Sequence, residues 1–124
     1  MSGAARGARG QLAEEAAARR LEALGYQIVT RNYRCRRGEI DLVARHGTCI
    51  VFVEVKARRE GIPASLQAVD ARKRRRMVRA ALEYLTERRL VGVNVRFDVA
   101  AVELDESGLP VAVQVLQDAF MEGE

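Results

Sequence analysis

Besides Arg45 and His46 near the bend, four charged side chains lie within two short, mostly apolar segments of this chain, Gly38–His46 and Cys49–Lys56. They are Glu39, Asp41, Glu54 and Lys56. Acidic groups inside apolar strands cost free energy unless something compensates their charge. Two or three converging carboxylates favour either a raised pKa or a bound cation, and Mg²⁺ prefers oxygen ligands of this kind. The residue types therefore predict a small acidic metal site with a lysine beside it.

The two segments predict a β-hairpin whose two-residue turn lies at 46–47 or at 47–48. Both turns keep the same faces together, because they differ by a shift of two residues in the pairing. Since side chains alternate along a strand, all four charged groups are expected on one face. The alternative is a solvated edge hairpin in which Glu39 and Lys56 form an ordinary cross-strand ion pair of small energetic value.

Asp41, followed on the next strand by Glu54-Val55-Lys56, resembles the core of the PD-(D/E)xK nucleases, which have the restriction-endonuclease-like fold. A finer resemblance is to the bacterial YraN family of predicted endonucleases, which is similar to archaeal Holliday-junction resolvases. The matching segments cover most of the chain between Leu12 and Val102, namely Gly25-Tyr26, Arg31-Asn32, Gly38–Leu42, Phe52–Lys56, and Lys73–Arg75 followed by Ala81–Leu85.

The resemblance implies Mg²⁺- or Mn²⁺-dependent hydrolysis of DNA, with Asp41, Glu54 and Lys56 as catalytic residues. The metal ligands in this interpretation are Asp41, Glu54 and the Val55 carbonyl, with Glu14 and Glu39 in second rank. Gln67 would support the site. Two positions depart from the pattern: Ala13 precedes Glu14 where the family usually has Gly, and Ile40 stands where the superfamily motif has Pro.

Charge is distributed unevenly along the 124 residues, whose formal net charge is +4. Residues 1–80 carry a net charge of +10, and residues 81–124 carry −6. A basic first two-thirds predicts a polyanionic partner, most simply nucleic acid, and DNA rather than RNA by resemblance. The alternative is a solvated, arginine-rich surface without a partner.

Three groups of basic residues are expected to contact phosphates. They are Arg31, Arg34, Arg36 and Arg37 in a loop after the first strand; Arg58 and Arg59 after the central hairpin; and Arg72, Lys73, Arg74, Arg75 and Arg76 on a long helix. Only two of the 21 basic residues are lysines, Lys56 and Lys73. Lysine offers a compact, titratable ammonium that arginine cannot replace, so both positions suggest a specific role.

The hydrophobic periodicity predicts one α/β domain. Residues 1–10 are expected to form a flexible basic arm, and residues 11–124 a single domain. A helix at 11–24 is followed by three strands, a helix to about residue 88 and two further strands, with Asp70 able to cap the long helix. This order matches the αβββαβ core of the resembled nucleases, a mixed sheet flanked by helices.

Other features limit the functional class. No apolar run is long enough to span a bilayer, and the amino terminus lacks the apolar core of a signal peptide. The two cysteines, Cys35 and Cys49, form neither a disulfide framework nor a metal-ligand spacing, so we expect reduced thiols in a cytoplasmic protein. The sequence therefore favours a DNA endonuclease, acting on branched or repair and recombination intermediates and forming a homodimer if it cuts junctions. The alternative is a DNA- or RNA-binding scaffold without catalysis.

Overall fold

The computed structural model describes residues 2–67 and 69–120, with side chains at 10–64 and 69–119. Within this part of the chain the elements are, in order, α1 (Ser2–Ala23), β1 (Gln27–Cys35), β2 (Gly38–His46), β3 (Cys49–Arg58), α2 (Ile62–Gln67), α3 (Ala71–Glu87), β4 (Asn94–Leu104) and β5 (Pro110–Phe120). This confirms the predicted order, and α2 is a short addition between the hairpin and the long helix.

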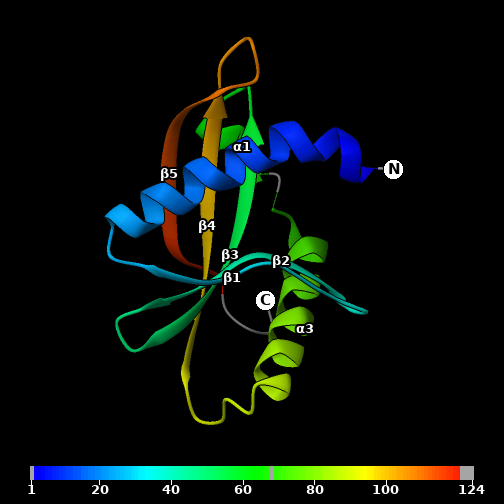
Figure 1. The fold of residues 1–124 in the computed structure, drawn as a ribbon, viewed down its shortest axis with the longest axis vertical. Helices are drawn as coiled ribbons and strands as arrows, with labels where there is room; N and C mark the ends of the chain where they lie inside the picture. Colours follow the sequence, from blue (N-terminus) through cyan, green and yellow to red (C-terminus); the bar gives the residue numbers. More distant parts are fainter. Residues whose placement is uncertain (1, 68, 121–124) are drawn as a thin grey trace.

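The five strands form one mixed sheet in the order β1-β2-β3-β4-β5. The pairs β1–β2, β2–β3 and β4–β5 are antiparallel, whereas β3 and β4 run parallel. The connection between β3 and β4 contains α2 and α3, as a parallel pair requires. Figure 1 shows α1 crossing one face of the sheet and α3 lying beside the β1–β2 ribbon. The predicted mixed α/β fold is confirmed.

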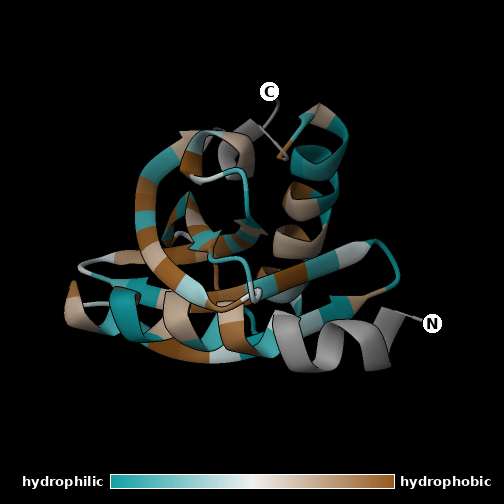
Figure 2. Ribbon diagram, turned by 90° about the horizontal axis from the view of Figure 1, so that it is seen from above, coloured by the Kyte–Doolittle hydropathy of each residue, from teal (hydrophilic) through white to brown (hydrophobic). Residues whose placement is uncertain are grey.

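Two hydrophobic clusters lie on the two faces of this sheet. One contains Met77 and Tyr84 of α3 packed against Phe52 of β3. The other contains Leu21 of α1 packed against Val53 of β3. In Figure 2, hydrophobic and hydrophilic residues alternate in bands along α3 and along the described part of α1, so each helix buries one side only.

Tight turns set the register of the central strands. His46 pairs with Cys49, so the β2–β3 turn lies at Gly47 and Thr48, the second of the two predicted positions. Gly47 has φ +60°, a conformation that glycine adopts without strain. Asp70 caps α3 as predicted, because its side chain accepts a hydrogen bond of 2.9 Å from the Lys73 backbone N–H.

Several predicted boundaries and faces differ from the structure. Helix α1 begins at Ser2 rather than residue 11. β1 extends to Cys35, so the arginines expected in a loop lie partly on a strand. Leu12 of α1 and Leu24 just after it are 44% and 40% exposed, whereas Ala13 and Ala18 are buried. The alanine-rich sequence gave too little contrast to fix which side of the helix faces the sheet.

None of the helices in the described part of the chain is long and apolar enough to cross a membrane. Cys35 and Cys49 are both free thiols.

Candidate active site

Asp41 and Glu54 lie where β2 separates from β3. The regular β2–β3 pairing runs from His46–Cys49 only as far as Leu42–Val53. Beyond that point the Asp41 Oδ2 atom accepts a hydrogen bond of 2.7 Å from the Val55 N–H of β3. Both carboxylates are buried, at 4% exposure for Asp41 and 1% for Glu54. The structure therefore brings together the two acids that the sequence singled out.

The strand bends at Asp41. Strict alternation would put Ile40 and Leu42 on the same face, yet they belong to opposite hydrophobic clusters. Across the β1–β2 pairing, Asn32 occupies the position opposite Asp41 and has φ +54°. Asparagine is among the non-glycine residues that most readily adopt this left-handed conformation. This local irregularity directs the Asp41 carboxylate toward β3 instead of across a regular pair.

Two lysines contact Glu54. Lys56 Nζ lies 3.2 Å from Glu54 Oε2, and Lys73 Nζ lies 3.5 Å from the same oxygen. Lys56 follows Glu54 by two residues on β3, so both side chains leave the same face. Lys73 comes from the first turn of α3. The site thus combines two carboxylates with two ammonium groups, and the contact between Lys73 and Glu54 was not foreseen.

Burial governs the electrostatics of Glu54. Desolvation and the nearby Asp41 carboxylate raise the pKa of Glu54 to about 8, and they outweigh the opposing effects of Lys73 and Lys56. Glu54 Oε1 is buried and has no hydrogen-bond donor among the described residues. The ionised form of Glu54 is therefore under-compensated on this oxygen, even with two lysines at the other.

This donor set fits a hard divalent cation. Mg²⁺ and Mn²⁺ bind carboxylate and carbonyl oxygens, and Mg²⁺ commonly uses only one or two protein carboxylates. Asp41 and the unpartnered Glu54 Oε1 supply oxygens of this kind. Among the described residues, no group of three or more His, Cys, Asp or Glu side chains could hold a metal ion. A divalent cation would therefore be held here by two carboxylates.

The two second-rank candidate ligands, Glu39 and Glu14, have surroundings that differ from those of Asp41 and Glu54. Because Ile40 packs on the α3 side, its neighbour Glu39 points to the other face, where it forms an ion pair of 3.5 Å with Arg34. The expectation that Glu39 shares a face with Glu54, or pairs with Lys56, is therefore wrong. Glu14 lines a hollow of about 440 Å³ that also includes Asn32, the residue opposite Asp41.

Comparison with known proteins places the chain in a family. Residues 13–102 match the uncharacterised protein family UPF0102. The chain belongs to this family. It is 49% identical to a UPF0102 protein of Moorella thermoacetica, over 90% of this chain and 94% of the relative. It is 47% identical to one of Syntrophus aciditrophicus, over 90% and 87% of the two chains. A Frankia casuarinae member is 44% identical over 94% and 98%.

Most of the predicted phosphate-contacting arginines of this UPF0102 chain are exposed. Those with exposed side chains are Arg31, Arg34, Arg36, Arg37, Arg58, Arg59, Arg72, Arg75 and Arg76. Arg74 and Lys73 are partly buried. Arg31 is held by an ion pair of 2.9 Å with Glu15 of α1. The side chain of Gln67 lies outside the described side chains.

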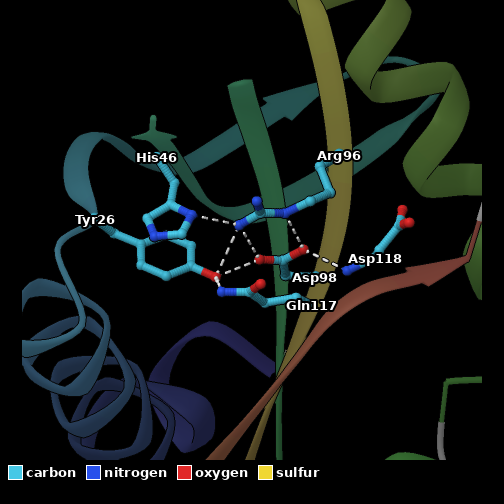
Figure 3. A network of polar contacts seen from close by, with 6 residues as sticks. All are labelled: Tyr26, His46, Arg96, Asp98, Gln117 and Asp118. Carbon is cyan, nitrogen blue, oxygen red and sulfur yellow. Dashed lines mark hydrogen bonds and ion pairs between the residues drawn. The ribbon is translucent and has the colours of Figure 1, made fainter. Parts of the chain in front are cut away.

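A buried polar network of this UPF0102 protein was missed by the sequence analysis (Figure 3). Asp98 is fully buried. Its carboxylate accepts hydrogen bonds from Tyr26 Oη at 2.6 Å, from Arg96 Nε and Nη2 at 3.0 Å each, and from the Asp118 backbone N–H at 2.9 Å. The Arg96 guanidinium also lies 2.9 Å from His46 Nδ1.

The same network fixes the end of α1 to the sheet. Tyr26, just after the helix, stacks on the His46 ring with centroids 4.1 Å apart. Burial and the Asp98 carboxylate raise the pKa of Tyr26 to about 12, so its hydroxyl stays protonated and can donate. One signal in the sequence pointed to the burial of Asp98. On β4, the same face carries the apolar residues Ala100 and Val102, and both are buried in the structure.

Proposed function

We propose that this protein binds nucleic acid and hydrolyses phosphodiester bonds of DNA with Mg²⁺ or Mn²⁺. The observation that carries the proposal is the pair of buried carboxylates, Asp41 and Glu54, with Lys56 on one of them. Buried acids are costly unless something compensates their charge, and a strongly perturbed carboxylate beside a lysine marks a candidate site. The resemblance to PD-(D/E)xK nucleases rests on these same residues.

Each residue has a defined part in the proposed reaction. Asp41 and Glu54 would hold the cation, and the Val55 carbonyl would complete the protein ligands by resemblance. When bound, the metal lowers the pKa of water and neutralises charge on the phosphate. Lys56 would orient or deprotonate the attacking water, or stabilise negative charge that develops on the phosphate. The Asp41–Val55 hydrogen bond keeps the first carboxylate in place while these groups act.

The arginine surface supports a polyanionic substrate. Arg36 and Arg37 lie exposed in the turn between β1 and β2, and Arg72, Arg75 and Arg76 lie exposed on α3. Gly38, at the start of β2, approaches the Arg76 backbone of α3 so closely that an added Cβ would lie 2.8 Å from the carbonyl oxygen. The turn and the helix therefore present one basic region, which suits a DNA backbone. Branched DNA and a homodimer follow from the resemblance to resolvases.

A second candidate is a nucleic-acid-binding scaffold without catalysis. It is favoured by one observation: two lysines contact Glu54 and supply positive charge to one of its oxygens without a metal. Metal binding separates the two functions. Isothermal titration with Mn²⁺ should show saturable binding that Glu54→Gln removes if the protein is the enzyme, and no specific binding if it is the scaffold.

The proposed function is tested with a panel of fluorescently labelled nucleic acids. Duplex, flap, four-way junction, single-stranded DNA and RNA are incubated with the protein in Mg²⁺, Mn²⁺ or EDTA. Cleavage of at least one DNA structure with metal, and none in EDTA, is the expected result. Binding without cleavage of any DNA in the panel would favour the scaffold instead.

A further inference from the structure

We propose that Lys73 is a substrate-contacting residue of this site, whose ammonium binds the phosphate backbone beside Asp41 and Glu54 and is held by Glu54 in the free protein. This inference rests on the nucleic-acid binding proposed above. Lys73 Nζ lies 3.5 Å from Glu54 Oε2, and its side chain is only 19% exposed. The sequence placed Lys73 among the residues expected to contact phosphates and singled it out as one of two lysines, and its contact with Glu54 now separates it from the exposed arginines.

Two independent contacts fix the position of Lys73 in the fold. The Asp70 side chain caps α3 by accepting the Lys73 backbone N–H at 2.9 Å, which fixes the position of Lys73 in the first turn. Gly38 allows β2 to meet the backbone of Arg76 one turn later, since an added Cβ would approach its carbonyl oxygen to 2.8 Å. The first turns of α3 are therefore held against the strand that carries Asp41.

The position is otherwise unfavourable for a cation. The first turn of α3 contains no acidic residue, and a positive charge there opposes the helix dipole. The same amino-terminal end attracts anions, which is the charge of a phosphate. The helix dipole disfavours the Lys73 ammonium, which is held by its contact with Glu54. When Glu54 binds another cation instead, Lys73 is free to move onto a phosphate.

The choice of lysine agrees with this role. Lys56 and Lys73 are the only lysines of the chain, and both contact the same Glu54 oxygen. An ammonium is a compact point charge on a flexible stem, so it can exchange one oxyanion for another with little movement. The competing explanation is that Lys73 only neutralises a buried acid and never contacts the substrate.

A binding experiment without metal separates these explanations. Affinity for a labelled DNA duplex is measured in EDTA, in alkaline buffer above the Glu54 pKa, for wild type and for Glu54→Gln, each with and without Lys73→Met. Glu54→Gln releases both Lys56 and Lys73, and the part of the tightening that comes from Lys73 should be about tenfold, the value of one charge-assisted contact. In the Lys73→Met background the improvement should therefore be about tenfold smaller than in otherwise wild-type protein, and what remains comes from Lys56. Arg72→Ala, an exposed neighbour on the same helix, is the matched control background and should retain the full improvement.

Each outcome is decisive for Lys73. An equal improvement in all three backgrounds, or none on Glu54→Gln in otherwise wild-type protein, overturns the proposal. Circular dichroism checks that every variant is folded, and Lys73→Gln replaces Lys73→Met if the latter is not. Because metal is absent, the result does not depend on cleavage. The effect of Lys73 on the Glu54→Gln improvement can be measured even if the protein never cuts DNA. Wild-type protein that does not bind DNA would instead overturn the proposed function, and this inference with it.

Discussion

At the scale of single residues, a catalytic role and a purely structural role of Lys56 predict different effects of the substitution Lys56→Arg. Lys56 Nζ lies 3.2 Å from Glu54 Oε2, an ion pair that arginine could also form. Arginine keeps the charge, but its wide guanidinium cannot occupy a compact position beside water and does not lose a proton near neutral pH. Lys56→Arg is therefore expected to reduce single-turnover cleavage by about two orders of magnitude or more while DNA affinity is retained.

The control for Lys56→Arg is the reverse substitution at the surface-oriented end of β3. Arg58→Lys exchanges the two cations in the opposite direction on an exposed side chain and should leave the cleavage rate near that of wild type. Near-normal turnover by Lys56→Arg would mean that Lys56 only compensates Glu54.

Glu54 gives a pH prediction for the metal-free protein. Its pKa is raised from 4.5 in the unfolded chain to about 8 in the folded protein, mainly by burial. A raised carboxyl pKa means that the folded state holds the proton more tightly, so this contribution to stability is complete below about 4.5 and is lost as the pH rises through about 8. Each unit of pKa shift corresponds to about 1.4 kcal/mol.

Thermal unfolding in EDTA measures this effect as a difference between two proteins. Glu54→Gln cannot titrate, so its melting temperature should fall less between mildly acidic and alkaline pH than that of wild type. Subtracting the two curves removes the groups that both proteins share. Parallel curves over this range would show that Glu54 has an ordinary pKa and that the site is better compensated than the structure indicates.

At the scale of elements, the Asp98 network joins β4, β5 and the segment after α1. Asp98 has no exposed surface and accepts bonds from Tyr26, Arg96 and the Asp118 backbone. Asp98→Asn removes the negative charge and leaves Arg96, whose side chain is 16% exposed, without its ionic partner. Breaking one partner of a buried pair is expected to destabilise the protein by about 3–5 kcal/mol.

Urea denaturation checks the Asp98 prediction, with Tyr26→Phe as a milder comparison. Tyr26→Phe removes one hydroxyl from the same network and should reduce the free energy of unfolding by about 1–3 kcal/mol. An Asp98→Asn protein within about 1 kcal/mol of wild type would show that Arg96 finds enough compensation elsewhere.

The elements also show what sequence reasoning can reach. The order of helices and strands and the Asp70 cap followed from local patterns and are confirmed, and the β2–β3 turn lies at the second of the two positions that the sequence left open. The meeting of Asp41 and Glu54 was predicted through regular alternation, but it arises from a bend at Asp41 that moves Glu39 to the other face. Such a bend depends on the tertiary packing of two strands, which periodicity does not encode.

At the scale of the whole molecule, the basic surface makes a prediction about salt. Arg72, Arg75 and Arg76 are exposed on α3. Replacing all three with alanine should weaken DNA binding regardless of sequence and lower the log–log salt slope by about 0.9 for each lost phosphate contact. Fluorescence anisotropy over a range of salt concentrations measures the slope. The comparison variant replaces Arg19 and Arg20, exposed on α1, and an equal loss in both proteins would mean that no face is preferred.

Long-range placement was the limit of prediction at this scale. The sequence singled out Lys73 by its residue type but not its partner, because the packing of α3 on β2 is what brings it to Glu54. Likewise, the contacts of the buried Asp98 could not be predicted because the partners of its carboxylate lie far along the chain, at Tyr26 and Asp118. In both cases the decisive contact joins segments that only the folded sheet brings together.

The central claim is that Asp41 and Glu54 form a metal-dependent hydrolytic site in this UPF0102 protein. Its most direct test is the single-turnover rate of cleavage of the best DNA substrate by wild type and by Asp41→Asn, at saturating Mn²⁺ and saturating protein. Asparagine is close in shape and can still accept the Val55 N–H, so the fold should be kept. We expect metal-dependent cleavage by wild type and a loss of at least about a hundredfold in Asp41→Asn. Equal rates for the two folded proteins would contradict it.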